Sequence, residues 1–154
     1  MLNEGDKVPD VALTGMDGKS FSPADFAGQK FVLYFYPKDD TTGCTAEAQA
    51  FTALAEAFEK EGTWVLGVSK DSPAKHAKFT EKYGLKVRLA TDETGAVCEA
   101  FGTWVEKSMY GRKYLGIERA TFLISRDGTI HRIWRKVKVA GHAEEVLAAA
   151  RELP

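Results

Sequence analysis

The sequence has 154 residues, of which 44% are hydrophobic, and its 21 Lys and Arg nearly balance 22 Asp and Glu. This length and composition suit one globular domain, which we expect to span residues 1–154. The near-neutral charge gives no reason to expect binding to nucleic acid or to an anionic membrane surface. No apolar run approaches the roughly 20 residues that span a bilayer, and no basic and apolar leader precedes residue 10, so we expect a cytoplasmic protein.

The first 29 residues contain short extended pieces separated by turn residues. Near their end, Ser22 precedes Pro23, and Gly28 follows a few residues later. Serine and then proline are typical of a helix start, and glycine is typical of a helix end. We therefore expect a helix of one to two turns here, within an N-terminal extension of the main sheet.

A continuous apolar run at 31–36 predicts a central strand that is covered on both faces. Apolar residues at helical spacing predict a helix over 45–60 directly after it. A second buried strand is expected at 62–69. The next helix, at 74–83, is opened by a serine–proline pair and closed by a glycine.

The second half of the chain predicts shorter elements. We expect a strand at 87–91, a short helix at 96–101, a long ordered loop at 104–118, strands at 121–125 and 129–135, and a helix at 141–153. Asp127 and Gly128 between the last two strands indicate a hairpin turn, since this pair tolerates positive φ. This element order predicts an α/β, thioredoxin-like three-layer fold: a mixed central sheet with helices on both faces, plus the N-terminal extension.

Cys44 is expected in or beside the first turn of the helix that follows the central strand. The free N–H groups and the dipole of a helix N-terminus favour a thiolate, which is the nucleophilic form of cysteine. Lowering the pKa of a thiol from about 8.5 to about 6 requires roughly 3.4 kcal/mol, whereas a helix end supplies at most about 2 kcal/mol. A reactive Cys44 therefore needs a cation from elsewhere in the fold, and arginine is favoured because it stays charged.

The neighbours of Cys44 argue against a purely structural role. A lone cysteine is most often a small buried hydrophobe. Here Thr41, Thr42 and Gly43 supply hydroxyls and backbone donors where a core cysteine would meet apolar side chains. Pro37 places a rigid bend between the strand and this polar turn.

The segment Pro37-Lys38-Asp39-Asp40-Thr41-Thr42-Gly43-Cys44 resembles the Pro-x-x-x-Thr-x-x-Cys signature of the peroxiredoxins. Four further segments, at 34–38, 43–45, 107–111 and 137–142, resemble the bacterioferritin-comigratory-protein (Q) subgroup. The resemblance implies that Cys44 attacks a peroxide, that Thr41 and Pro37 shape its pocket, and that a late arginine completes the site. Arg119 matches that arginine and precedes a predicted strand next to the central one; Arg112, in the expected loop, is the competing candidate.

By this resemblance we expect a thiol-dependent peroxidase that reduces hydrogen peroxide, organic hydroperoxides or both through a sulfenic acid, in antioxidant defence. No cofactor or metal is expected, the reductant is thioredoxin or a similar dithiol, and the chain is a monomer or a weak dimer.

Recycling departs from the subgroup pattern. Many members carry a resolving cysteine five residues after the first, but Gln49 occupies that position here. Cys98 is the only other thiol, and its spacing from Phe101 predicts a packed core residue. We therefore favour a one-cysteine cycle that uses an external thiol, with a disulfide between Cys44 and Cys98 as the alternative.

Rival functions fit less well. A thiol–disulfide oxidoreductase needs a cysteine at position 47, where Glu47 stands, and a cysteine phosphatase needs an arginine at position 50, where Ala50 stands. A non-catalytic thioredoxin-like interaction module predicts an unreactive Cys44. The histidines at 76, 131 and 142 follow no metal-ligand spacing and no partner pattern, although the last is expected at a helix start.

Overall fold

The computed structural model, which describes residues 2–154, is built around strand β3 (Lys30–Phe35). All six residues of β3 are buried, as the continuous apolar run predicts for a strand covered on both faces. Strand β4 (Thr63–Ser69) pairs with β3 in parallel, and β5 (Arg88–Thr91) pairs in parallel with β4. On the other side of β3, β8 (Ala120–Ile124) and β9 (Ile130–Trp134) continue the sheet in antiparallel fashion.

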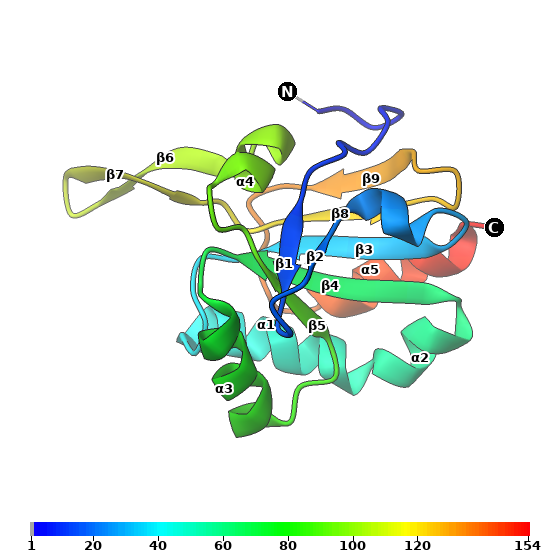
Figure 1. Cartoon of the computed structure of the whole chain (residues 1–154), viewed down its shortest axis with the longest axis horizontal. Coiled ribbons are helices and arrows are strands. Elements are labelled where there is room, and N and C mark those ends of the chain that lie inside the picture. The colour runs from blue at the N-terminus through cyan, green and yellow to red at the C-terminus, as the bar shows by residue number, and fades with distance from the viewer. Residues whose placement is uncertain (1) are drawn as a thin grey trace.

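The N-terminal extension completes the sheet at its other edge. Strand β1 (Leu13–Gly15) pairs antiparallel with β5, and β2 (Ser20–Phe21) pairs with β1. The seven strands lie in the order β2-β1-β5-β4-β3-β8-β9, so the sheet is mixed, as expected (Figure 1).

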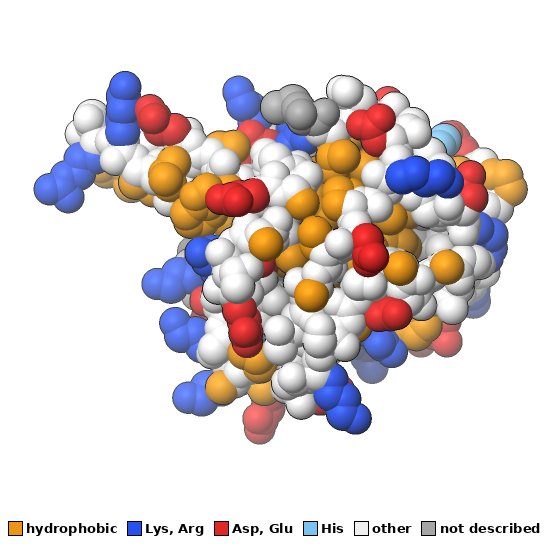
Figure 2. All heavy atoms as spheres, turned by 45° about the horizontal axis from the view of Figure 1, so that its top comes forward, with side chains coloured by type: hydrophobic (Ala, Val, Ile, Leu, Met, Phe, Trp, Pro, Cys, Tyr) orange, Lys and Arg blue, Asp and Glu red, His pale blue; other side chains and the backbone are white. Residues whose placement is uncertain are grey.

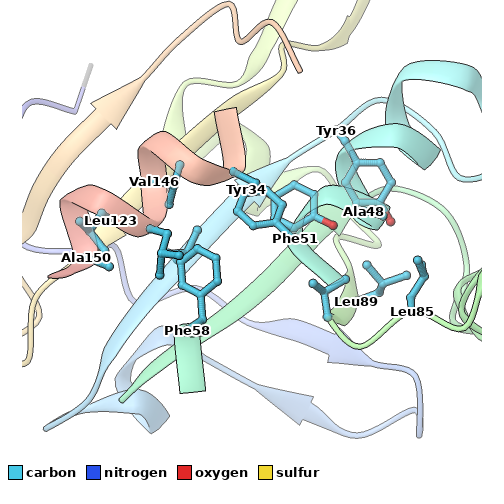
Figure 3. Close-up of a cluster of buried hydrophobic side chains, with 14 of the residues drawn as sticks. Tyr34, Tyr36, Ala48, Phe51, Phe58, Leu85, Leu89, Leu123, Val146 and Ala150 are labelled. Carbon is cyan, nitrogen blue, oxygen red and sulfur yellow. The ribbon is translucent and has the colours of Figure 1, made fainter. Parts of the chain in front are cut away.

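Helices cover both faces of this sheet and make three layers (Figure 1). One face carries α1 (Thr42–Ala53), α2 (Ala55–Lys60), α3 (Pro73–Tyr83) and α5 (His142–Glu152), and the other carries α4 (Ala96–Phe101) and the short 3-10 helix η1 (Pro23–Phe26). Alternate residues of β3 point to opposite faces, so that Tyr34 packs under α1 (Figure 3) while Phe35 packs toward α4. Over residues 2–154, no helix has the length and apolar character required to cross a membrane.

The predicted helix over 45–60 is wrong in two respects. It begins earlier, at Thr42, and it is interrupted at Leu54, which ends α1 and precedes α2. Apolar residues keep their helical spacing across the break, and no glycine or proline marks it, so the pattern does not reveal the interruption. The earlier start makes Cys44 the third residue of α1.

The predicted loop over 104–118 is also wrong. This segment forms a separate two-stranded sheet, β6 (Trp104–Met109) and β7 (Arg112–Ile117), which projects from the body of the molecule (Figure 1). Its turn residues Tyr110 and Gly111 both have positive φ, at 52° and 79°, which is the geometry of a tight hairpin turn. Figure 2 shows charged and apolar side chains side by side on this arm, so burial imposes no alternating pattern on its sequence.

The other elements agree with the sequence to within a residue or two. Ser72 caps α3 by accepting a hydrogen bond from the backbone N–H of Lys75, and Gly84 ends that helix with a φ of 60°. The short helix α4 has the predicted bounds. The turn at Asp127 and Gly128 joins β8 to β9 as expected.

Candidate active site

The pairing of β3 with β8 creates the site. Because β8 runs antiparallel to β3, Ala120 at the start of β8 lies opposite Phe35 at the end of β3. The residue before β8 is Arg119, and the segment after β3 leads into α1 and Cys44. Two segments that are far apart in the sequence therefore meet at the same edge of the sheet.

Cys44 and Arg119 are in direct contact. Nη2 of Arg119 donates to Sγ of Cys44 over 3.4 Å, and Nη1 of the same guanidinium donates to Oε1 of Glu47 over 2.7 Å. Cys44 is only 2% exposed. The fork of the guanidinium thus joins the sulfur to a carboxylate one helical turn further along α1.

Gly43 allows this close approach. A Cβ atom at position 43 would lie 3.1 Å from Nη2 of Arg119, which is tighter than an ordinary van der Waals contact. The absence of a side chain at this position therefore lets the guanidinium reach the sulfur.

The charges at the site are strongly coupled. Burial would lower the pKa of Arg119, but the interactions with Glu47 and with the Cys44 sulfur outweigh it and raise this pKa above its usual value. Burial raises the pKa of Glu47 to about 7, against the opposing effect of the Arg119 charge. Within the described chain, Oε2 of Glu47 is buried without a hydrogen-bond partner.

Thr41 stands at the N-cap of α1. Its backbone carbonyl accepts from the N–H of Thr45, while its hydroxyl donates to the carbonyl oxygen of Lys38 over 2.8 Å. Since a hydroxyl has one hydrogen, this bond leaves its lone pairs free to accept from another group. Pro37 is exposed at the start of the same loop, directly after the buried Tyr36.

Cys98 lies on the other side of the sheet. It is fully buried in the core cluster that contains Phe101, whereas Cys44 belongs to the cluster beneath α1 and α5. This confirms the expectation of a packed core residue. Both cysteines are free thiols, and they belong to different core clusters on opposite faces of the sheet. Burial, aided by the nearby Asp92 carboxylate, raises the pKa of Cys98 to about 12.

Other predicted residues have clear positions. Arg112, the competing arginine, is exposed at the first position of β7. His142 begins α5, as expected, and its Nε2 lies 2.8 Å from the Thr121 hydroxyl. Residues 2–154 contain no group of three or more His, Cys, Asp and Glu that could hold a metal ion.

Two features of the site were missed by sequence reasoning. The first is Glu47, whose position three residues after Cys44 puts it on the same side of the helix and could have indicated its role. The second is His76, for which the sequence shows no partner pattern. In the structure His76 is fully buried and its Nδ1 lies 2.7 Å from the carboxylate of Asp39. No local sequence pattern predicts the contact between His76 and Asp39.

The mixed sheet, the helices on both faces and the cysteine at the start of the helix that follows the central strand define a thioredoxin-fold protein. The AhpC/TSA family model matches residues 4–133. The chain is 48% identical over 142 residues to peroxiredoxin Bcp of Xanthomonas campestris, covering 92% of this chain and 89% of that one. It is 44% identical over 149 residues to peroxiredoxin Bcp of Bacillus subtilis, covering 97% and 95% of the two chains.

A solved structure agrees with these relatives. The X. campestris bacterioferritin comigratory protein, whose alkyl peroxide reduction activity was studied through trapped complexes, superimposes with a TM-score of 0.90 at 44% identity. The match covers 97% of this chain and 98% of that one. The chain belongs to the AhpC/TSA family and groups within it with the Bcp, or PrxQ, peroxiredoxins, which are thiol-dependent peroxidases.

Proposed function

We propose that the protein reduces peroxides through the thiolate of Cys44. The observation that carries this proposal is the 3.4 Å contact between Nη2 of Arg119 and the Cys44 sulfur. This contact supplies the cation that a reactive thiolate needs in addition to the helix end, whose effect alone is too small. It also argues against a non-catalytic interaction module, because such a module has no need of a guanidinium at this sulfur.

In the proposed reaction, the thiolate attacks one oxygen of the peroxide and the O–O bond breaks. The attacked oxygen keeps its hydrogen and becomes the sulfenic acid of Cys44, while the other oxygen leaves as alkoxide or hydroxide and takes a proton from water. Arg119 and the backbone N–H groups at 43–44 stabilise the charge that moves along the O–O bond. The free lone pairs of the Thr41 hydroxyl accept from the O–H of the attacked oxygen, and Pro37 shapes the loop around it.

Recycling is proposed to use an external thiol. Position 49 is an exposed glutamine, and Cys98 is fully buried in the other core cluster. A thiol of thioredoxin or of a similar dithiol would condense with the sulfenic acid to form a mixed disulfide and water. The second thiol of that reductant would then release Cys44 as a thiolate.

The substrate range and the setting are part of the proposal. The alkyl peroxide activity studied in the X. campestris relative supports organic hydroperoxides as substrates beside hydrogen peroxide. Two free cysteines and the need for a thiol donor suit a reducing compartment, so we propose that the protein acts in the cytoplasm, in antioxidant defence. The subgroup resemblance supports a monomer formed by one domain.

Stopped-flow oxidation of the reduced protein by hydrogen peroxide tests nucleophile and recycling together. We expect a single fast phase, followed by trapping of one sulfenic acid at Cys44 with a dimedone-type reagent in mass spectrometry. A disulfide between Cys44 and Cys98 in the oxidised protein would overturn the one-cysteine cycle. Absence of any oxidation at Cys44 would overturn the peroxidase itself.

A further inference from the structure

A buried polar cluster lies beside the Cys44 loop without touching the sulfur. The carboxylate of Asp39 accepts from the Tyr36 hydroxyl at Oδ1 over 2.5 Å, and its Oδ2 lies 2.7 Å from Nδ1 of His76. Nε2 of His76 lies 3.0 Å from the carbonyl oxygen of Ala90. His76 is 0% exposed and the Asp39 side chain only 6%, so this cluster connects the loop after β3 to α3 and β5 away from water.

The hydrogen positions in this cluster follow from its partners. A carbonyl oxygen only accepts, so Nε2 of His76 carries a hydrogen and donates it to Ala90. The Tyr36 hydroxyl donates to the first oxygen of Asp39, and one proton lies between the second oxygen and Nδ1 of His76. Each side chain of the cluster therefore has a partner, and in a buried setting such a fully bonded set is rigid.

The rigidity is transmitted to one peptide group. The backbone N–H of Asp39 donates to Oδ2 of Asp71 over 2.8 Å, and the same oxygen accepts from the hydroxyl of Ser69 over 2.7 Å. The carbonyl of Lys38 belongs to the same planar peptide group as the N–H of Asp39. Fixing the N–H through Asp71, and the side chain through His76, therefore also fixes the direction of that carbonyl.

That carbonyl is the acceptor of the Thr41 hydroxyl, over 2.8 Å. Its direction decides where the hydroxyl hydrogen points, and hence where the free lone pairs of Thr41 point. We propose that His76, acting through Asp39, is a positioning residue of the peroxide site: together with Asp71 it holds the peptide group whose carbonyl orients the Thr41 hydroxyl. This inference rests on the proposed function of Cys44 and adds a residue that touches neither sulfur nor peroxide.

A second connection between the same loop and α3 provides a contrast. Asp40, which has a φ of 59°, accepts from Nζ of Lys82 over 2.8 Å and from the hydroxyl of Tyr83 over 2.6 Å. The Lys82 and Asp40 side chains are 58% and 43% exposed, and exposed ion pairs hold a structure weakly. Lys82→Ala is therefore a matched control that removes a contact between the same two segments.

The test compares two substitutions of one residue by stopped flow. His76→Asn keeps a donor at the place of Nδ1, facing Asp39, whereas His76→Gln keeps a donor at the place of Nε2, facing Ala90. For each variant the rate of Cys44 oxidation by hydrogen peroxide is compared with its rate of alkylation by iodoacetamide. Alkylation needs the thiolate but does not need an oriented Thr41 hydroxyl.

We expect His76→Gln to slow peroxide oxidation by about tenfold or more, because a small misplacement of a reacting group can cost up to about 100-fold. Its alkylation rate should change by less than about twofold. His76→Asn should recover most of the peroxide rate, and Lys82→Ala should leave both rates unchanged. Asp71→Ala removes the acceptor of the Asp39 N–H at a partly exposed position, and it should show the same selective loss even if His76→Gln does not fold.

Equal peroxide rates in His76→Gln and wild type would overturn the inference, as would a parallel fall in both rates. The same reading applies to Asp71→Ala, with thermal unfolding reporting whether each variant is native. A wild-type protein that does not react with peroxide would instead overturn the proposed function, and with it this inference.

Discussion

Cys44 and Cys98 occupy the same helical position and meet opposite charges. Each is the third residue of its helix, α1 or α4, and each is at most 2% exposed. The sulfur of Cys44 receives the guanidinium of Arg119 at 3.4 Å, whereas the backbone N–H of Cys98 donates to the carboxylate of Asp92 at 2.8 Å. Position at a helix start is therefore shared by both thiols, and the nearest charged side chain distinguishes them.

The difference shows how much each influence contributes. A helix end stabilises a negative charge by at most about 2 kcal/mol, and burial easily outweighs that amount. At Cys98 burial comes first, the Asp92 charge acts in the same direction, and the pKa rises to about 12. The thiol of Cys98 therefore stays protonated and unreactive at neutral pH, while Cys44 is the candidate nucleophile.

The largest expected effect on peroxide consumption comes from replacing each cysteine, one at a time, by serine. Cys44→Ser should abolish peroxide consumption, because a serine hydroxyl is not ionised at neutral pH. Cys98→Ser should keep it with a small dithiol as reductant. Loss of peroxide followed by colorimetry measures both variants. Turnover retained in Cys44→Ser would show that the comparison assigns the nucleophile wrongly.

Next in size is the removal of the cation. Arg119→Ala should reduce the second-order rate with hydrogen peroxide by about 10²- to 10³-fold, the range for losing one donor to a developing negative charge. Arg119→Lys keeps the positive charge but lacks the forked guanidinium, so its rate should lie between those of wild type and Arg119→Ala. Stopped-flow oxidation at equal protein concentration measures all three proteins, and circular dichroism verifies their fold. An alanine variant as fast as wild type would contradict the role of Arg119.

A third expected effect concerns the partner of that cation and its pH dependence. The carboxyl of Glu47 has a pKa of about 7 in the folded protein against an ordinary value of 4.5, with burial as the main cause. Because the folded state binds this proton more tightly, the unfolding free energy of wild type should fall, relative to Glu47→Gln, as pH rises through that interval. At about 1.36 kcal/mol per pKa unit, the full difference is about 3 kcal/mol.

Urea unfolding of wild type and Glu47→Gln at about pH 4.5 and about pH 8 measures this effect. The two proteins should be similar at the lower pH, where Glu47 is mostly protonated, and the glutamine variant should be more stable at the higher pH. A variant that instead loses stability at the higher pH would mean that the attraction of Arg119 outweighs the burial of the carboxylate.

The smallest expected effect is at the other thiol. Asp92→Asn removes the charge beside Cys98 and keeps one acceptor oxygen, which can serve the N–H groups of Gly95 and Val97, while the oxygen that accepts from the Cys98 N–H is lost. In a Cys44→Ser background, iodoacetamide should then alkylate Cys98 less than about tenfold faster, because burial, the main cause of the raised pKa, remains. A rate equal to that of wild-type Cys44 would show that the neighbouring charge, and not burial, keeps Cys98 inert.

Local signals in the sequence were enough to predict the buried strands, the capped helices and the tight hairpin turn. The apolar run of β3, the serine and glycine that bound α3, and the turn at Asp127 and Gly128 were all sufficient. The β6–β7 arm was not predicted, since most of its side chains are exposed and no face needs to be apolar. In the sequence only Gly111 hinted at its turn, where the structure gives both Tyr110 and Gly111 a positive φ.

The site residues that neighbouring strands of the sheet bring together could be predicted, whereas contacts made between helices and loops could not. Arg119 was indicated by the resemblance to the peroxiredoxins, and the expected position of its strand next to the central one supported its place near Cys44. The contacts of Arg119 with Glu47 and of His76 with Asp39 join residues 72 and 37 positions apart. A single sequence does not record such pairs, because either partner alone is an ordinary helix or loop residue.

The burial of Cys44 sets a ceiling on the proposed cycle. Because Cys44 is only 2% exposed, a molecule as small as hydrogen peroxide can reach it far more readily than a protein dithiol can. We therefore expect the donor to gain access when the first turn of α1 opens transiently. The turnover rate should therefore reach a maximum that equals the rate at which this turn opens. Above that point, a higher concentration of reductant should not increase the turnover rate.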